Sequence, residues 1–153
     1  MRSGTAAAWA EGAVTAIAGG ALGAFAGSFV GLGWPAGIVG ALNGALSGAR
    51  ATYRWRSPWG WLAFLLDSTW SLPMTASGLA AHAVAATQRR GPNYVADLSR
   101  RRNRHVYIRG LRARPGFVLT LGNVINGAGK RVLTSDRRRK LITDHEDVHV
   151  WQA

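Results

Sequence analysis

The stretch AVTAIAGGALGAFAGSFVGLG (residues 13–33) decides the fold of the first third of the chain, together with AGIVGALNGALSGARATY (residues 36–53) after Trp34-Pro35. Its glycines recur at every fourth position, at Gly19, Gly23, Gly27 and Gly31 and again at Gly40, Gly44 and Gly48. Glycine costs roughly 1 kcal/mol relative to alanine in a helix, so a regular series of glycines indicates another use. Positions four apart share one helical face, where bare backbone lets a second helix approach closely. The spacing predicts two antiparallel helices packed along these glycines.

Both segments are long and apolar enough to cross a bilayer. At 1.5 Å per residue, residues 13–33 would span about 31 Å and residues 36–53 about 27 Å, close to the thickness of the hydrocarbon layer. No charged side chain lies between Ala13 and Ala49. The expected fold is therefore a membrane α-helical hairpin. The alternatives are a buried hairpin inside a soluble protein and a secretory signal peptide.

This glycine pattern resembles that of glycine-zipper two-helix membrane modules. The resemblance rests on the four-residue spacing within residues 13–53 and covers roughly the first third of the chain. It implies self-association, so that the protein would be a homo-oligomer or a subunit of a membrane complex. It implies no chemistry.

Positive charge is concentrated in the second half of the chain. The formal net charge is +12, and residues 89–140 contain fifteen Arg and Lys against two Asp. Basic segments stay on the cytoplasmic side of membranes, so we expect a protein of the bacterial inner (cytoplasmic) membrane with its basic tail in the cytoplasm. Cysteine is absent, which excludes disulfides and thiolate metal ligands. We divide the chain into a transmembrane hairpin (1–57), a broken apolar segment (58–88) and a basic tail (89–153).

A third apolar stretch, residues 59–87, is interrupted by Asp67 and Pro73. A single crossing would carry the basic tail to the outside, against the charge rule. We therefore expect two short helices that break near Leu72-Pro73 and are re-entrant or lie at the membrane interface. A full span is the alternative.

Two ionisable residues lie in this third stretch. Asp67 and His82 would be near lipid, where ionisable groups are candidates for function. Asp67 could instead cap a helix or pair with an arginine such as Arg54 or Arg56, and this interpretation is slightly favoured.

The tail combines β-forming runs with one helical run. Residues 105–109 are rich in β-forming side chains and predict a strand, with residues 117–121 as its partner. A third short strand is expected at residues 131–133. Residues 134–136 are favourable N-caps for a helix that runs to Trp151. The expected tail is a small α+β unit of two or three strands and a C-terminal helix.

The helical run contains DHEDVHVWQ (residues 144–152), which holds an H-E-x-x-H motif. Two histidines four apart project from one helical face and can bind one zinc ion, while the glutamate beside the first can take a proton from the attacking water. The motif resembles the active-site helix of the zincin metalloproteases, and the longer run resembles that of small bacterial membrane-associated HExxH proteins. The resemblance implies zinc ligation by His145 and His149, with Glu146 as the general base.

A catalytic zinc ion needs three protein ligands and an open position. Zincins take the third ligand from downstream, and only four residues follow the motif in this sequence. Asp144 and His105 are our candidates for the third ligand, followed by His82 and Asp67, and a neighbouring subunit could also supply it. Without a metal, the histidines would be ordinary helical residues and Glu146 a charge partner for arginines.

Two basic clusters, residues 100–104 and 137–140, can bind phosphate groups. Beside membrane helices, lipid headgroups are the simplest partner to expect, and each basic residue near the surface adds about 1 kcal/mol to the free energy of membrane binding. Nucleic-acid binding would add a recognisable module or aromatic residues for stacking, and the tail has few of these, Tyr94 and Tyr107 among them. We therefore expect anionic membrane lipids as partners and do not expect nucleic acid.

Together these features predict an oligomerising membrane protein with a zinc-binding, metalloprotease-like site in its basic tail. As an enzyme it would carry out metal-assisted peptide hydrolysis. The alternative is a non-enzymatic membrane scaffold or assembly subunit, whose glycine-zipper hairpin drives self-association.

Overall fold

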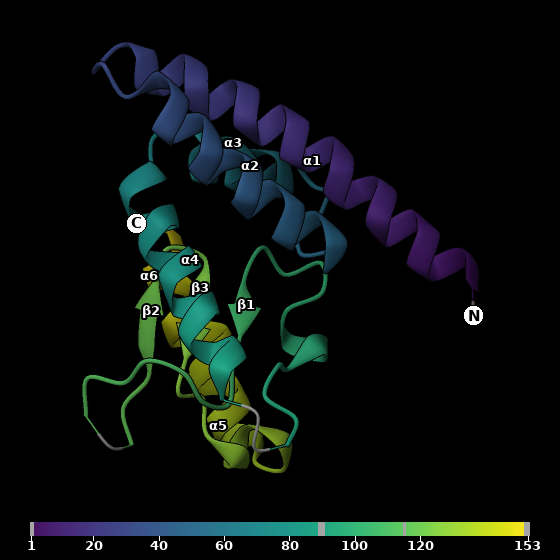
Figure 1. The fold of residues 1–153 in the computed structure, drawn as a ribbon. Helices are drawn as coiled ribbons and strands as arrows, with labels where there is room; N and C mark the ends of the chain where they lie inside the picture. The colour runs from purple at the N-terminus through teal and green to yellow at the C-terminus, as the bar shows by residue number, and fades with distance from the viewer. Residues whose placement is uncertain (1, 89–90, 115, 152–153) are drawn as a thin grey trace.

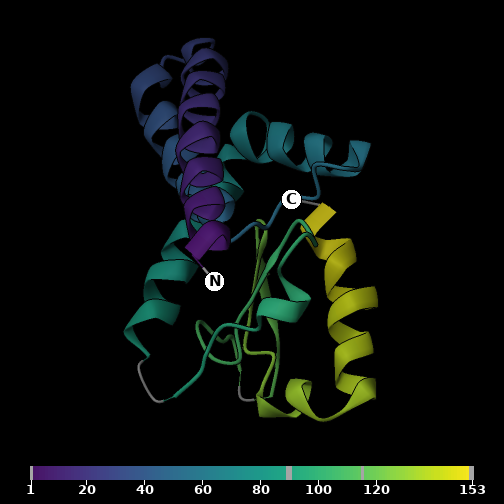
Figure 2. The ribbon, with the colours of Figure 1, turned by 90° about the vertical axis from the view of Figure 1, so that its right-hand side faces the viewer.

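The computed structural model describes residues 2–88, 91–114 and 116–151, which form a mostly helical structure with one small sheet (Figure 1). The first half contains the helices α1 (Arg2–Ser28), α2 (Gly33–Ala49), α3 (Pro58–Ser68) and α4 (Leu72–Thr87). The second half contains η1 (Ala96–Leu98), β1 (His105–Val106), β2 (Leu119–Leu121), β3 (Val124–Asn126), η2 (Lys130–Leu133), α5 (Asp136–Lys140), η3 (Leu141–His145) and α6 (Glu146–Trp151). The paired helices α1 and α2 extend away from the sheet (Figure 2).

The close approach that the glycine spacing predicts is found between α1 and α2. A Cβ atom added at Gly19 would lie 2.5 Å from the carbonyl oxygen of Gly40, a distance that real Cβ atoms do not reach. The hydroxyl of Thr15 lies 2.6 Å from the carbonyl oxygen of Gly44 and adds a hydrogen bond between the helices. Six of the predicted glycines lie at this contact, Gly19, Gly23, Gly27, Gly40, Gly44 and Gly48, and Gly12, Gly20 and Gly37 also face the partner helix.

Gly31 has a different role from the other six glycines. Because α1 ends at Ser28, Gly31 lies in the turn before α2, where an added Cβ atom would meet nothing within 4 Å. The assignment of Gly31 to the packing strip is therefore wrong. Its φ of +73° belongs to the left-handed region, which glycine adopts without steric cost.

One helix among the described residues, Thr5–Ser28, is long and apolar enough to cross a membrane. Helix α2 has 17 residues, and its second half is buried against the rest of the chain at Asn43 and Ser47. Large apolar side chains are exposed along the pair at Val14, Ile17, Phe25, Phe29, Val30, Leu32, Trp34, Ile38 and Leu42. A transmembrane hairpin stays a prediction for this pair.

The third apolar stretch is divided into α3 and α4. Helix α3 ends at Ser68 and α4 begins at Leu72, with Pro73 in its first turn, where the missing N–H is not needed. The break predicted near Leu72-Pro73 is thus confirmed. Large apolar side chains are exposed on and just after α3 at Trp59, Trp61, Leu62, Leu65 and Trp70. The place of α3 and α4 relative to a membrane stays a prediction.

The sheet has the strand order β1–β3–β2. Strand β3 pairs in parallel with β1 and antiparallel with β2, with Thr120 opposite Ile125. The prediction that residues 105–109 and 117–121 pair directly is wrong, because β3 lies between the two strands.

The third strand also lies elsewhere than the sequence predicts. Residues 131–133 belong to η2, a 3-10 helix, so the strand expected there is wrong. The observed third strand, β3, is formed by three buried residues just before the turn at Gly127. Its short apolar run ends at Asn126, directly before Gly127.

Helices cover both faces of the sheet (Figure 2). Val124 packs in one cluster with Ala81 and Ala85 of α4. Its neighbour Ile125 packs in a second cluster that includes Ile142 of the C-terminal helix. Val124 and Ile125 pack on different faces of the sheet because successive side chains of a strand point to opposite faces. The H-E-x-x-H helix is thereby held against the sheet.

The boundaries at residues 57 and 88 stay a prediction. The loop after α2 is hydrogen-bonded to the first arginine cluster, since the Arg101 N–H donates to the Ala51 carbonyl oxygen and the Asn103 N–H to that of Thr52. Glu11 of α1 also forms an ion pair with Arg101 at 2.6 Å. These contacts join α1 and the loop after α2 to the segment just before β1.

Candidate active site

The C-terminal helix consists of three pieces, α5, η3 and α6, that follow one another without a loop, and the H-E-x-x-H motif begins at the last residue of η3 and continues into α6. Ser135 is the N-cap, and its hydroxyl accepts a hydrogen bond from the Arg138 N–H at 3.4 Å. The piece in the middle, η3, is a π-helical turn that ends at His145. Such turns inside α-helices are frequent at functional sites.

The two motif histidines lie together on the exposed side of this helix. The ring centres of His145 and His149 are 5.0 Å apart, edge to face, and both side chains are exposed. Two imidazoles that bind one tetrahedral zinc ion at about 2 Å through ring nitrogens have ring centres on the order of 5 Å apart. The pair therefore fits two of the ligand positions of zinc.

Glu146, in contrast, points toward the sheet. Its side chain is 8% exposed, and its Oε2 atom accepts a hydrogen bond from the Thr120 hydroxyl at 2.8 Å. Thr120 is the central residue of β2. The structure thus places the carboxylate beside the sheet, next to the two histidines.

Within residues 2–88, 91–114 and 116–151, no three His, Asp or Glu side chains come together as a metal-binding group. Asp144 is exposed, and its Oδ1 atom accepts a hydrogen bond from the Thr143 hydroxyl at 2.8 Å. Of the residues proposed for the metal, the structure brings His145 and His149 together and joins no third ligand to them.

His105 lies in a buried polar cluster between α2, α4 and β1. Its Nε2 atom is 2.9 Å from the Ser47 hydroxyl and its Nδ1 atom 3.1 Å from the Tyr94 hydroxyl. His82 packs against it with ring centres 4.5 Å apart. Burial, with Arg50 nearby, lowers the pKa of His82 to about 3, and burial also lowers the pKa of His105 well below its ordinary value. Both histidines are therefore neutral in this arrangement, and neither lines the groove beside His145 and His149.

Asp67 lies at the other end of the same buried region. Its Oδ2 atom accepts hydrogen bonds from the Tyr53 hydroxyl at 2.8 Å and from Asn123 Nδ2 at 2.7 Å. In the described part of the chain the ion pairs involve Glu11, Asp97 and Asp147, so the predicted pairing of Asp67 with an arginine is wrong. Burial raises the pKa of Asp67 to about 6.

A groove of about 600 Å³ lies between β2 and the H-E-x-x-H helix, and we call it the edge groove. His145, Glu146 and His149 line one wall, and Phe117 and Thr120 belong to the wall formed by β2 and the residues before it. Within the described residues β2 pairs with β3 on one side only, and Leu119 and Thr120 of this edge strand line the groove. The candidate catalytic residues and an edge strand therefore share one depression.

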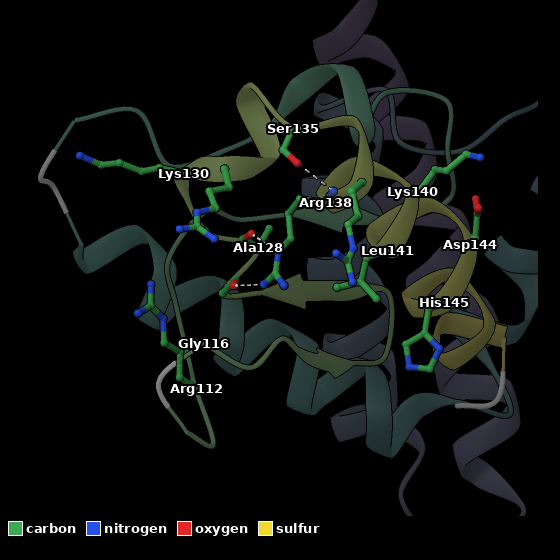
Figure 3. A pocket seen from close by; sticks show the side chains of 14 residues that line it. Arg112, Gly116, Ala128, Lys130, Ser135, Arg138, Lys140, Leu141, Asp144 and His145 are labelled. Atoms are coloured by element: carbon green, nitrogen blue, oxygen red, sulfur yellow. Dashed lines mark hydrogen bonds between the residues drawn. The ribbon is translucent and has the colours of Figure 1, made fainter.

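A second depression, of about 880 Å³, lies around α5 and the turn that precedes η2 (Figure 3). We call it the basic hollow. Its basic lining residues are Arg112, Lys130, Arg131, Arg137, Arg138 and Lys140. Asp144 is the one acidic residue of the lining, and none of the ion pairs found in the described residues involves these six basic side chains.

The two predicted phosphate-binding clusters lie in different parts of the molecule. In the first cluster, Arg101 pairs with Glu11 of α1, and Arg104 pairs with Asp147 of α6. The second cluster lies on α5, at the end of the molecule opposite the α1–α2 pair (Figure 1). One lipid surface in contact with the α1–α2 pair would therefore meet the first cluster and leave the second one remote.

Comparison with protein-family models, with curated proteins and with solved structures finds no match to this chain. The functional assignment therefore rests on geometry. Sequence reasoning missed Thr120, although a single polar residue within the apolar run FVLTL (117–121) was a usable signal. It also missed the basic hollow, whose residues come from separate segments that only the fold brings together.

Proposed function

We propose that this chain is a membrane-attached protein with a zinc-dependent, metallopeptidase-like site. The observation that carries the proposal is the placement of His145, Glu146 and His149 in one groove with the edge strand β2. A ligand pair, a general base and a binding edge for a peptide backbone then lie within reach of one another.

The histidines and the glutamate would have separate roles. His145 and His149 would hold zinc through ring nitrogens, and a second copy of the chain would supply the third ligand. Zinc, when bound, supplies a Lewis acid that polarises the peptide carbonyl. Glu146 would accept the proton of the attacking water on its carboxylate and pass it to the leaving amine. Thr120, which donates to Glu146 Oε2, acts as a positioning residue.

The strand edge explains how a peptide would be held. An edge strand presents unpaired N–H and C=O groups, to which an extended peptide can add as a further strand. Strand β2 has such an edge beside Glu146. A peptide bound there would lie with its backbone beside the two motif histidines.

The exposed apolar surface supports membrane attachment. Large apolar side chains cover the outer parts of α1, α2 and α3, more than a soluble monomer usually leaves in water. We propose that the glycine-packed α1–α2 pair anchors the protein in the bacterial inner membrane as a homo-oligomer. The basic tail would be cytoplasmic, with the cluster at residues 100–104 near anionic headgroups.

A non-enzymatic scaffold is the second candidate function. It is favoured by the tight α1–α2 glycine contact. In that case the α1–α2 pair would drive assembly and the H-E-x-x-H helix would be structural.

Peptide hydrolysis by the purified full chain in detergent with zinc separates the two functions. Glu146→Gln should lower the rate at least about 100-fold, because it removes the general base and no proposed metal ligand. Asp136→Asn, an exposed carboxyl at the start of α5, is the matched control and should keep the parent rate. A parent protein that binds zinc without hydrolysing peptides would favour the scaffold.

A further inference from the structure

The edge groove and the basic hollow adjoin one another. Both are lined by Gly116, Arg138, Leu141 and His145. His145, which is drawn in Figure 3, thus borders the hollow as well as the groove that holds Glu146. A chain that lies along β2 and continues past His145 enters the basic hollow.

The hollow concentrates positive charge, because its lining has six basic side chains and one acidic residue, Asp144. Arg138 is fixed in place, since its Nε atom donates to the Ala128 carbonyl oxygen at 2.9 Å, as Figure 3 shows. The side chains of Arg137 and Lys140 are exposed on α5 beside it, and neither forms an ion pair in the described part of the chain. Like charges so close together repel one another, and an anionic ligand would relieve this repulsion.

The anion could be a lipid headgroup, a nucleic acid or an acidic peptide, and the position of the hollow favours one of these three. Helix α5 lies at the end of the molecule opposite α1 and α2, so headgroups of a bilayer that holds this pair would not reach it (Figures 1 and 2). The described lining of the basic hollow contains no Phe, Tyr or Trp on which a nucleic-acid base could stack, and the edge groove has one such residue, Phe117. The hollow also adjoins the edge groove, and this position favours an extended peptide as the anionic ligand.

We propose that the basic hollow binds acidic side chains of a peptide whose backbone lies along β2. The site would therefore select acidic peptide segments as its substrates. This inference rests on the proposed peptide site and names its substrate class. The volume of about 880 Å³ lies in the range of ordinary ligand pockets and leaves room for more than one side chain.

Peptide binding measured without zinc tests the inference separately from hydrolysis. Two labelled peptides of equal length, one with a run of Glu and one with Gln at the same positions, are titrated with the full chain in detergent and followed by fluorescence anisotropy. The acidic peptide should bind at least about tenfold more tightly, and this preference should weaken as salt is raised.

The double variant Arg137→Gln/Lys140→Gln should remove most of the preference and leave the affinity for the Gln peptide unchanged. The matched control Arg56→Gln/Arg100→Gln removes two exposed charges outside the hollow and should keep the preference. Unchanged thermal unfolding shows that both variants are folded.

Three outcomes would overturn the inference. Equal affinity for the two peptides would remove the charge selection and leave a general peptide site standing. A preference that survives Arg137→Gln/Lys140→Gln would place the acidic side chains elsewhere. Displacement of the acidic peptide by equimolar inorganic phosphate or by single-stranded DNA would identify a general anion site. Selective binding by a chain that hydrolyses no peptide when zinc is present would support the inference and count against the proposed enzyme.

Discussion

At the level of single residues, the buried groups between α2, α3 and the sheet set how the fold responds to pH. Asp67 has its pKa raised by burial to about 6, against 3.8 for an ordinary carboxyl. The folded state therefore binds a proton more readily than the unfolded state between these two values. The charged carboxylate costs stability above pH 6, on the order of 3 kcal/mol, and this cost is relieved as the pH falls toward 4.

The first prediction concerns Asp67→Asn. The amide carries no charge, so the variant should be more stable than the parent at pH 7.5, by about 1–3 kcal/mol. This gain should fall by about half at pH 5, where the parent carboxyl is largely protonated. Urea unfolding in detergent at the two pH values measures the difference.

Asp97 provides the control for that experiment. Its hydrogen bond to Arg139 lowers its pKa below the ordinary value, so its contribution to stability is lost only in stronger acid. The effect of Asp97→Asn should therefore be the same at pH 7.5 and pH 5. If the effect of Asp67→Asn on stability is also the same at both pH values, burial does not raise the pKa of Asp67 and the prediction is contradicted.

At the level of elements, the contact between α1 and α2 and the contact between α6 and β2 have different origins. The helix pair is fixed by sequence-local spacing, because glycines four apart form a strip on one face. The contact of Glu146 with Thr120 joins residues 26 positions apart and depends on the order of the strands. The α1–α2 contact was predictable from the sequence, and the contact between α6 and β2 was not.

The second prediction concerns the glycine contact. A methyl group at Gly40 would collide with the backbone of Gly19, so Gly40→Ala should lower stability by about 1–3 kcal/mol, even though alanine is the better helix former. Gly33→Ala is the matched control, since a Cβ atom there would be 3.4 Å or more from its neighbours. It should be neutral or stabilising by up to about 1 kcal/mol. Thermal unfolding in detergent compares the two, and equal effects would contradict the packing role of Gly40.

The strands were harder to predict than the helices. Strand β1 has two residues, and β2 and β3 have three each, which leaves too few positions for a periodic pattern. The N-cap at Ser135 and the break before Pro73 depend on local chemistry, and both were found from the sequence. Strand β3 was missed because Asn126-Gly127 gives a strong turn signal at its end.

At the level of the whole molecule, apolar and basic surfaces lie at opposite ends. Most of the exposed large apolar side chains belong to α1, α2, α3 and the turns that follow them, and the basic hollow surrounds α5 (Figure 1). The sequence predicted a divided chain, because the two compositions are separate along it. It could not predict that the edge groove and the basic hollow adjoin one another at His145, since their linings come from several segments.

The third prediction concerns orientation. Ala113 is exposed in the basic tail, and the chain has no cysteine, so Ala113→Cys introduces a single accessible thiol. With a cytoplasmic tail, this thiol should resist a membrane-impermeant reagent in intact cells and react after the cells are opened. Rapid labelling of intact cells would place the tail outside and contradict the proposed orientation.

Equilibrium dialysis of the purified chain against zinc tests the central claim most directly. The account predicts stoichiometric zinc in the parent protein, its loss in His149→Ala and its retention in Glu146→Gln, because only the first variant removes a proposed ligand. Circular dichroism confirms that the helices are folded in each sample. A folded parent protein that binds no zinc would contradict the metal site and leave the membrane scaffold as the function.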